Sequence, residues 1–250
     1  INGQWKQGGS GQWDENRNPA RPSDLIGKAT RSHALDIERA IDAAQKSQPE
    51  WSRTPRPKRG AILAKAASLM RGKIETLAKT ITREEGKNLA EARGEVQKAI
   101  NCLEFTAAES RRPTGQVIPS ELPGTMIYTT RAPLGVVAVI TPWNFPVCIP
   151  VWKIAAALVE GNAVVFKPAS ATPASANLLT RIFEEAGVPA GVLNLVYGSG
   201  AQVGSILASD PRVRGISFTG SNDVGVQLNI AAAKSFKRVQ LELGGKNALI

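Results

Sequence analysis

Hydrophobic positions follow two different spacings along the second half of the chain. Short segments rich in apolar and β-prone residues predict buried strands at 134–140, 162–167, 192–196, 215–218 and 238–242. Between them, apolar residues recur at helical spacing, which predicts helices at 149–160, 174–185, 201–208 and 223–233. Strands and helices that alternate in this way predict an α/β fold with a doubly wound parallel sheet and right-handed crossovers.

The first half is organised differently. Apolar positions there have helical spacing in four segments, at 34–48, 62–70, 74–81 and 89–103. Residues 1–31 combine glycine, asparagine, proline and tryptophan at turn-like spacing, which predicts short peripheral strands or hairpins. The helical segments carry no evident chemistry of their own.

A segment rich in proline and glycine separates the two halves. Residues 113–132 hold prolines at 113, 119 and 123 and glycines at 115 and 124, then β-prone residues, which predicts an extended ribbon. Because an unpaired ribbon edge is a liability for a monomer, this segment favours self-association as a dimer or tetramer. The chain is thus divided into 1–112, 113–132 and 133–250.

Composition limits the class of protein. A hydrophobic content of 42% and a charged content of 21% are typical of a soluble globular protein. We find neither an apolar run as long as a membrane span nor a secretory leader, and expect no membrane partner. Cys102 and Cys148 provide neither a disulfide framework nor a metal-ligand spacing. We therefore expect no metal and a reducing compartment, the cytoplasm.

The formal net charge of +10 raises the question of nucleic-acid binding. The basic residues are scattered, however, and the densest cluster, 53–59, lies in a proline-rich turn without interleaved aromatic residues. We therefore expect no nucleic-acid partner. Two explanations of the charge stay open: an acidic second half that balances it, which we favour, and a field that attracts an anionic cofactor and an acidic substrate.

Two polar residues follow the first two predicted strands of the parallel sheet. Asn144 lies in the proline-bounded turn after 134–140, and Lys167 ends 162–167. Parallel strands joined by one helix place both at the carboxyl edge of the sheet, where open α/β sheets bind ligands. As alternatives, Asn144 is a turn-former and Lys167 extends to solvent along its aliphatic stem.

Two later turns are candidates for phosphate binding. The glycine-rich turn at 198–204 follows a strand and opens a helix, but its glycine spacing departs from the dinucleotide fingerprint, so a tight turn explains it equally well. The turn at 218–221 is stronger, because it presents free N–H groups at a helix start, and Ser221 adds a hydroxyl. Ser221 is also suited to capping that helix.

Four motifs, in this order, carry a family resemblance: TPWNFP at 141–146, FKPAS at 166–170, FTGS at 218–221 and LELGGKN at 241–247. They resemble the aldehyde dehydrogenase superfamily over essentially the whole chain, but only its first half. The resemblance implies a variant Rossmann cofactor domain built from 1–112 and 133–250, with 113–132 as an oligomerisation arm. It also implies that the catalytic domain, with the nucleophilic cysteine, lies beyond Ile250, so that this chain alone is inactive.

The resemblance assigns three catalytic residues. Asn144 matches the family's oxyanion donor, Glu242 its general base, and Lys153 a lysine near the proton path. Burial of Glu242 between leucines would suit a base that takes a proton from a thiol or from hydrolytic water. The alternative is a glutamate of an edge strand that faces solvent. The cofactor residues that the resemblance implies are Ile140, Thr141, Pro142, Trp143, Lys167, Ala169, Ser170, Gly200, Gly204, Phe218, Thr219, Gly220, Ser221, Val224, Leu243 and Gly244.

The cofactor implied is NAD or NADP. Where NAD-preferring members commonly hold a glutamate, this chain has Ser170, which does not repel a 2′-phosphate, so we favour NADP. The function implied is oxidation of an aldehyde, and the stretch CIPVWKIAAAL with Ser170 resembles the semialdehyde dehydrogenases of sugar-acid degradation. The alternatives are a nucleotide-binding module without turnover, a scaffolding role in the oligomer, and a related acyl-phosphate or acyl-CoA reductase.

Overall fold

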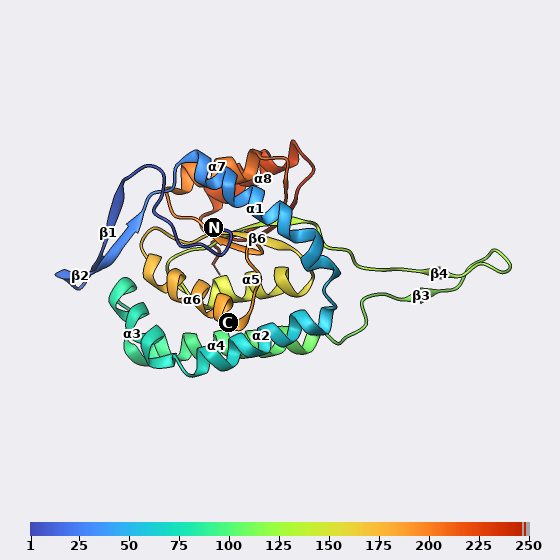
Figure 1. Cartoon of the computed structure of the whole chain (residues 1–250), viewed down its shortest axis with the longest axis horizontal. Coiled ribbons are helices and arrows are strands. Elements are labelled where there is room, and N and C mark those ends of the chain that lie inside the picture. Colours follow the sequence, from blue (N-terminus) through green and yellow to red (C-terminus); the bar gives the residue numbers. More distant parts are fainter. Residues whose placement is uncertain (247, 249–250) are drawn as a thin grey trace.

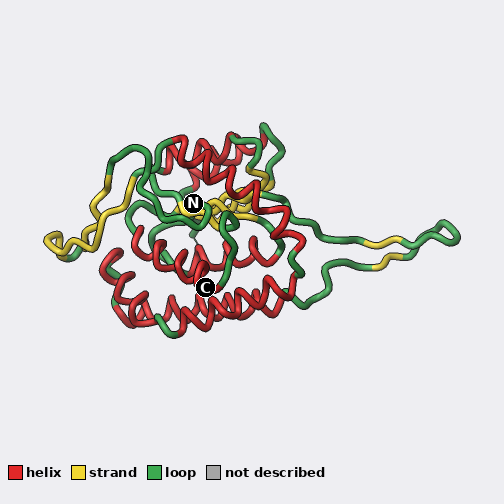
Figure 2. Tube along the Cα trace, in the orientation of Figure 1, coloured by secondary structure: helices red, strands yellow, loops and turns green. Residues whose placement is uncertain are grey.

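A five-stranded parallel sheet lies at the centre of the molecule. The computed structural model describes residues 1–246 and 248 (Figures 1 and 2). The strands of this sheet are β5 (Val136–Ile140), β6 (Ala163–Lys167), β7 (Leu193–Leu195), β8 (Val213–Thr219) and β9 (Arg238–Glu242). Their order is β7-β6-β5-β8-β9, with every neighbouring pair parallel. The predicted doubly wound sheet is therefore confirmed.

Helices connect the strands and cover both faces of the sheet. These connecting helices are α5 (Cys148–Val159), α6 (Pro173–Ala186), α7 (Gly200–Ser209) and α8 (Asn222–Ala233). The chain moves outward from β5 through β6 to β7, then returns to β8 on the other side of β5. This reversal makes a topological switch point between β5 and β8, the place where open α/β sheets bind ligands.

Residues on opposite faces of β5 belong to two separate hydrophobic clusters. Val137 and Val139 pack with α5 and α6, whereas Val136, Ala138 and Ile140 pack with the helices of the other face. All five residues of β5 are buried, because the strand lies at the centre of a sheet covered on both sides. The near-continuous apolar run in the sequence has this cause.

The N-terminal helices complete these two clusters. They are α1 (Ala34–Arg53), α2 (Arg56–Arg71), α3 (Ile74–Glu85) and α4 (Leu89–Glu109). The first covers the sheet together with α7 and α8, and the other three pack outside α5 and α6 (Figure 1). The second helix begins six residues earlier than predicted, since Pro57 lies in its first turn, where the missing N–H is no loss.

Two hairpins project from this body. Strands β1 (Trp13–Asn18) and β2 (Arg21–Thr30) pair antiparallel, which confirms the predicted peripheral strands. The predicted ribbon contains β3 (Val117–Ile118) and β4 (Ile127–Tyr128), which pair over two residues each. It extends far from the body in Figure 1. Gly115 is needed there, because an added Cβ would lie 1.8 Å from the carbonyl oxygen of Thr129.

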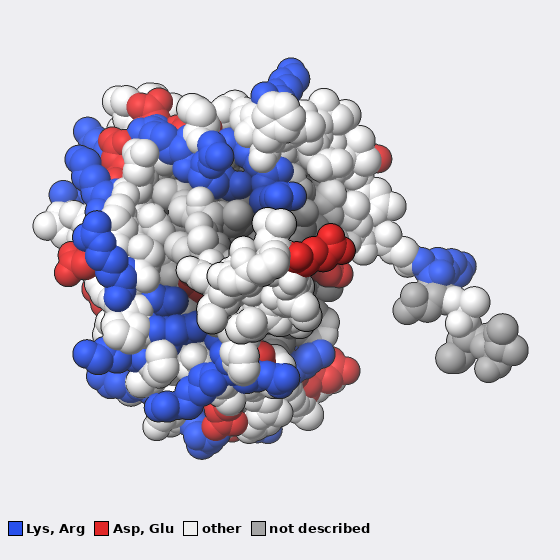
Figure 3. Space-filling model, turned by 90° about the vertical axis from the view of Figure 1, so that its right-hand side faces the viewer, with Lys and Arg blue, Asp and Glu red and all other residues white. Residues whose placement is uncertain are grey.

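Charge is distributed around the base of the ribbon. Figure 3, which faces the side from which the ribbon projects, shows Lys and Arg side chains spread over several separate groups, with a few acidic side chains among them.

Among the helices that the structure describes, we find none that is long and apolar enough to cross a membrane.

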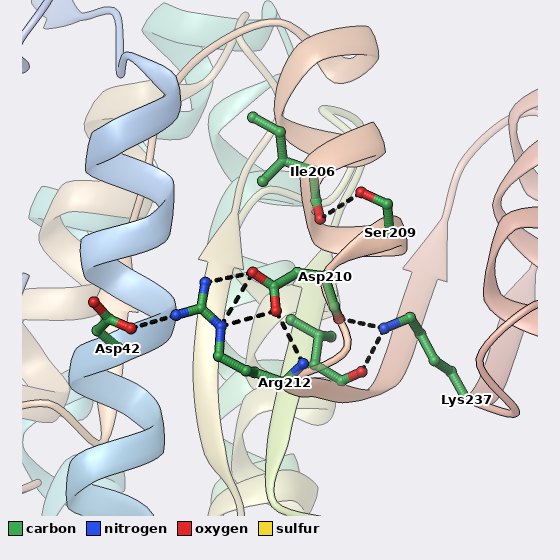
Figure 4. A network of polar contacts seen from close by, with 7 residues as sticks. Asp42, Ile206, Ser209, Asp210, Arg212 and Lys237 are labelled. Atoms are coloured by element: carbon green, nitrogen blue, oxygen red, sulfur yellow. Dashed lines mark hydrogen bonds and ion pairs between the residues drawn. The ribbon is translucent and has the colours of Figure 1, made fainter.

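A polar network closes the amino edge of the sheet, where β8 and β9 begin (Figure 4). The Arg212 guanidinium donates to Asp210 (Nε to Oδ1, 2.9 Å) and pairs with Asp42 of α1. Lys237 is buried, and its Nζ donates to the carbonyl oxygens of Asp210 and Val213, the latter at 2.7 Å. Arg212 and Lys237 therefore supply hydrogen-bond donors to the carboxylates and backbone carbonyls where β8 and β9 begin.

Candidate functional site at the carboxyl edge of the sheet

The predicted motifs meet at the opposite edge, where the parallel strands end. The register of the sheet places Ile140 beside Lys167 on one side and beside Phe218 on the other. In the next pair, Thr219 lies beside Glu242. Residues from four stretches of sequence that are far apart therefore share one edge, as the predicted topology requires.

The sixteen predicted cofactor residues differ in exposure along this edge. Those that are buried are Ile140, Thr141, Lys167, Gly204 and Phe218. The partly buried ones are Pro142, Ala169, Thr219 and Gly220. The exposed ones are Trp143, Ser170, Gly200, Ser221, Val224, Leu243 and Gly244. Gly204 does not lie in one of the turns at this edge. It lies inside α7, where an added Cβ would be 4.0 Å from Leu228 of α8.

The turn between β5 and α5 presents Asn144 to solvent. The amide of Thr141 donates to the carbonyl oxygen of Lys167 (3.2 Å), so the turn starts directly at the end of the sheet. Trp143, Asn144 and Phe145 are exposed. Within the described part of the chain, the Asn144 side chain forms no hydrogen bond, so its amide is available to a bound molecule.

Two buried hydroxyls flank the switch point without a partner. Within the described residues, neither Thr141 Oγ1, at the end of β5, nor Thr219 Oγ1, at the end of β8, has a hydrogen bond. Ser221 stands at the N-cap of α8, but its side chain makes no capping bond. Ser221 thus occupies the predicted N-cap position, but its hydroxyl does not bond to the first turn of the helix. Free hydroxyls beside a helix N-terminus fit the pyrophosphate of a dinucleotide.

The loops that follow β6 and β7 adjoin each other. Lys167 is only 5% exposed, so the alternative that its ammonium group reaches bulk solvent is wrong. Its Nζ donates to the carbonyl oxygen of Pro168 (3.0 Å), and burial lowers the pKa of its ammonium group. Exposed Ser170 donates through Oγ to the carbonyl oxygen of Gly198 (3.2 Å), which joins its loop to the glycine-rich turn.

Lys153 begins a chain of polar side chains under the edge. It is buried in α5, and its Nζ donates to Ser217 Oγ (3.0 Å) and Gln240 Oε1 (2.9 Å). Gln240 Nε2 in turn donates to Glu242 Oε1 (2.8 Å). Burial lowers the pKa of Lys153 to about 8, and the charge of Glu242 opposes this shift. Sequence reasoning missed Ser217 and Gln240, since both lie more than sixty residues from Lys153.

The expected burial of Glu242 is wrong for this chain. Glu242 is exposed, and Leu243 beside it is 38% exposed. The reason is its position in β9, an edge strand whose residues alternate between exposed and partly buried. The backbone of Glu242 is nevertheless anchored, because its carbonyl oxygen accepts from the amide of Gly220 (3.2 Å). Asn247, in the same motif, lies outside the described residues.

Cys148 is not suited to nucleophilic attack. Cys148 is fully buried, and burial raises the pKa of its thiol to about 12, so the reactive thiolate does not form near neutral pH. Cys102 is half-buried in α4. Where the structure describes the chain, no group of three His, Cys, Asp or Glu side chains gathers to hold a metal ion.

A further cleft lies elsewhere. It has a volume of about 980 Å³ and is lined by residues 1–8 together with α1 and α6, including Asp36 and Glu184. It lies against the β7 side of the sheet and contains none of the predicted catalytic residues. The polar edge, and not this cleft, is therefore the candidate site.

Comparison with known proteins identifies relatives over the whole chain. The model of the aldehyde dehydrogenase family matches residues 5–250. The alpha-ketoglutaric semialdehyde dehydrogenase of Bacillus subtilis (strain 168) is 47% identical over 250 residues, which is 100% of this chain and 51% of that protein. The NADP(+) succinate-semialdehyde dehydrogenase GabD of Escherichia coli (strain K12) is 42% identical, over 100% of this chain and 52% of that protein.

Solved structures agree with these sequence matches. Betaine aldehyde dehydrogenase from Staphylococcus aureus, in complex with NAD+, superimposes with a TM-score of 0.96 at 32% identity. The match covers 99% of this chain and 49% of that one. The chain thus spans about half the length of these relatives.

Proposed function

Because the chain belongs to the aldehyde dehydrogenase family, we propose that it forms the cofactor-binding half of an NAD- or NADP-dependent enzyme that oxidises a carboxylate-bearing semialdehyde to the acid. Relatives named alpha-ketoglutaric semialdehyde and succinate-semialdehyde dehydrogenase support this substrate class. The observation that carries the proposal is the carboxyl edge itself, where an unbonded Asn144 amide and the polar chain from Lys153 to Glu242 flank the switch point.

Residues at this edge fit a dinucleotide. The unpartnered hydroxyls of Thr141 and Thr219, with the uncapped N-terminus of α8, suit the pyrophosphate. Lys167, which ends β6 three residues before Ser170, suits the adenosine ribose. NAD+ and NADP+ supply a hydride acceptor when bound. We assign the preference to NADP, because Ser170 brings no negative charge against a 2′-phosphate.

Three side chains of this chain have roles in the proposed reaction. A cysteine of the second half adds to the aldehyde carbon, and the Asn144 side chain donates a hydrogen bond to the oxyanion that develops. Glu242 takes a proton from the water that hydrolyses the thioester, which releases the acid and the thiol. Lys153 reaches Glu242 through Gln240, which donates to the Glu242 carboxylate, and so orients this base near the proton path.

The proposal is tested with the full-length protein and purified aldehydes. We expect reduction of NADP+ with 2-oxoglutarate semialdehyde or succinate semialdehyde, and a kcat/KM at least about tenfold lower with an uncharged aldehyde of equal length. Formation of the carboxylic acid is measured alongside the reduced cofactor. The absence of oxidation with every aldehyde, or equal kcat/KM values, would contradict the proposed substrate class.

The role of Glu242 has its own test. In Glu242→Gln, formation of reduced cofactor in the first turnover is expected to persist, while the acyl-enzyme accumulates because water is not activated. Rapid-quench detection of the thioester measures this. Hydrolysis at the wild-type rate would show that another group is the base.

The ribbon at 113–132 is proposed to pair with another subunit. It exposes apolar side chains far from any described partner: Val117, Ile118, Leu122, Met126, Ile127 and Tyr128. An isolated two-stranded ribbon is at best marginally stable in water, because its edges leave backbone N–H and C=O groups unpaired. A sheet formed with another subunit pairs these groups. Charged residues at Val117 and Met126 are expected to lower the oligomer mass measured by light scattering, whereas an unchanged mass contradicts the pairing.

The rest of the chain is proposed to form one cofactor-binding unit. Residues of 1–112 and of 133–250 share both hydrophobic clusters, so neither part has a separate core. Two free cysteines, Cys102 and Cys148, agree with a cytoplasmic location.

A second candidate function, nucleotide binding without turnover, is favoured by the inert thiol of Cys148. NADPH binding by a full-length protein that oxidises no aldehyde would select it.

A further inference from the structure

A lysine and a glutamate outside the parallel sheet hold the turn that carries Asn144. Gly86 ends α3 in the left-handed conformation (φ 90°), and the side chain of Asn88 caps α4 two residues later by accepting from the amide of Glu91 (2.9 Å). Lys87 lies between these two caps, so its backbone is fixed on both sides. Its position is therefore well defined although it lies in a loop.

The ammonium group of Lys87 contacts the turn at Asn144. Its Nζ donates to the main-chain carbonyl oxygen of Asn144 (2.8 Å) and lies 4.0 Å from the centre of the Phe145 ring. It also donates to Glu95 Oε2 (2.8 Å) and lies 3.4 Å from Glu85. The Lys87 side chain is only 10% exposed, so these contacts are partly shielded from water.

Glu95 holds the other end of the same turn. Its side chain is fully buried, and its second oxygen, Oε1, accepts from the amides of Val147 (2.9 Å) and Cys148 (3.1 Å). Val147 occupies the N-cap position of α5, and its own side chain forms no hydrogen bond to the first turn of the helix. Glu95 therefore supplies this cap from α4, and its negative charge lies at the positive end of α5.

These contacts define the position of Asn144 without touching its side chain. The carbonyl of Asn144 is bound on one side and the amides three and four residues later on the other, while the side-chain amide stays exposed. We propose that Lys87 and Glu95 are positioning residues that aim the Asn144 amide at the oxyanion, an inference that rests on the proposed aldehyde oxidation. An oxyanion donor contributes most when its direction is set before the charge develops.

Burial of the pair is costly, which bears on its role. A buried lysine and glutamate lose their hydration, and an apolar pair of similar volume often stabilises a fold as well or better. What an apolar pair does not supply is a donor for the carbonyl of Asn144 and an acceptor for the amides of Val147 and Cys148. Both charged groups are thus used on the backbone of one turn.

The test is a double-mutant cycle in the full-length enzyme, with Lys87→Met, Asn144→Ala and the double variant. Lys87→Met is expected to lower kcat by roughly 10- to 100-fold, as does loss of other supporting contacts around reactive groups. The dissociation constant of NADPH is expected to stay unchanged. In the Asn144→Ala background, Lys87→Met is expected to change kcat by less than about twofold, because non-additivity marks residues that act through one another.

The matched control is Lys98→Met. Lys98 is an exposed lysine of α4, the helix that carries Glu95, and lies 5.8 Å from the ring of Trp152 in α5, so it joins these two helices away from the turn. Its removal is expected to leave kcat unchanged. An equal loss in Lys98→Met would overturn the assignment, since any weakened contact between α4 and α5 would then suffice.

Other outcomes separate this inference from the proposed function. Wild-type activity in Lys87→Met, or losses in Lys87→Met and Asn144→Ala that simply multiply, would overturn the positioning role while aldehyde oxidation stands. A wild-type enzyme that oxidises no aldehyde, or an Asn144→Ala variant with full activity, overturns the proposed role of Asn144 itself and the inference with it. If Lys87→Met does not fold, Glu95→Gln takes its place in the same cycle, with the same expected non-additivity.

Discussion

The two edges of the parallel sheet treat their polar groups in opposite ways. At the amino edge, Arg212, Asp210 and Lys237 bond to one another and to backbone carbonyls (Figure 4). At the carboxyl edge, the hydroxyls of Thr141 and Thr219 have no partner within the described residues. Both edges belong to the same strands, so the difference arises from the loops. One edge stabilises the fold, and the other leaves bonding capacity for a ligand.

The largest expected effect belongs to the carboxyl edge. Replacing Asn144 by alanine in the full-length enzyme is expected to lower kcat by about 10²- to 10³-fold, as for the loss of one oxyanion donor. The free energy of unfolding is expected to change by less than about 0.5 kcal/mol, because the side chain is exposed and unbonded. Steady-state kinetics and chemical denaturation measure the two quantities. A loss of stability without a loss of kcat would reverse the comparison of the edges.

The next effect concerns the amino edge. Arg212→Met removes charged hydrogen bonds to Asp210 and to Asp42, and is expected to lower the free energy of unfolding by about 2 kcal/mol. The dissociation constant of NADPH should not change, because the edges are at opposite ends of the strands. Arg214→Met, at an exposed position of β8 two residues later, is the control and is expected to be neutral. Weakened NADPH binding in Arg212→Met alone would show that the edges are coupled.

A smaller effect sharpens the assignment of the carboxyl edge. Ser170→Glu places a carboxylate beside the glycine-rich turn and is expected to shift the NADP/NAD preference towards NAD by about tenfold, roughly 1.4 kcal/mol. Ser205→Glu adds the same charge at an exposed position of α7 and is expected to leave the preference unchanged. The ratio of kcat/KM for the two cofactors decides. An unaltered ratio in Ser170→Glu would remove the specificity argument.

The smallest effect is the pH dependence of the amino edge. The Arg212 guanidinium lowers the pKa of the Asp210 carboxyl below its ordinary value of 3.8. Because the unfolded chain binds this proton more readily, the contribution of Asp210 is complete above about pH 4 and is lost as the pH falls through the lower folded value. Asp210→Asn should flatten the acid limb of the stability curve. Equally steep acid limbs in both proteins would show that other carboxyl groups dominate acid unfolding.

The regular part of the fold was predictable because burial leaves a strong pattern. The run 136–140 is buried on both faces and is continuously apolar, and the strands and helices after it were predicted to within a few residues. The family was also predictable, since four motifs in register identified it and the match over residues 5–250 confirms it. Helix α2 was predicted too short, because its first turn carries no apolar stripe.

The contacts within the site were not predictable in the same way. Asn144, Lys153 and Glu242 were named from motifs, whereas Ser217 and Gln240, which join Lys153 to Glu242, carry no local signal. Glu95 lies in α4 and Lys87 in the loop before it, and this part of the sequence carries no motif that indicates chemistry. Both lie some fifty residues before the turn that they hold.

Local order along this chain follows from the side chains themselves, because the spacing of apolar residues and the position of proline and glycine decide which segments become strands, helices and turns. Long-range order does not. The exposure of Glu242 depends on β9 lying at the edge of the sheet, and the support of Asn144 depends on α4 packing against α5. Such contacts join residues that are far apart in the sequence, so they form only when the helices and strands pack together. No local spacing of apolar residues indicates them.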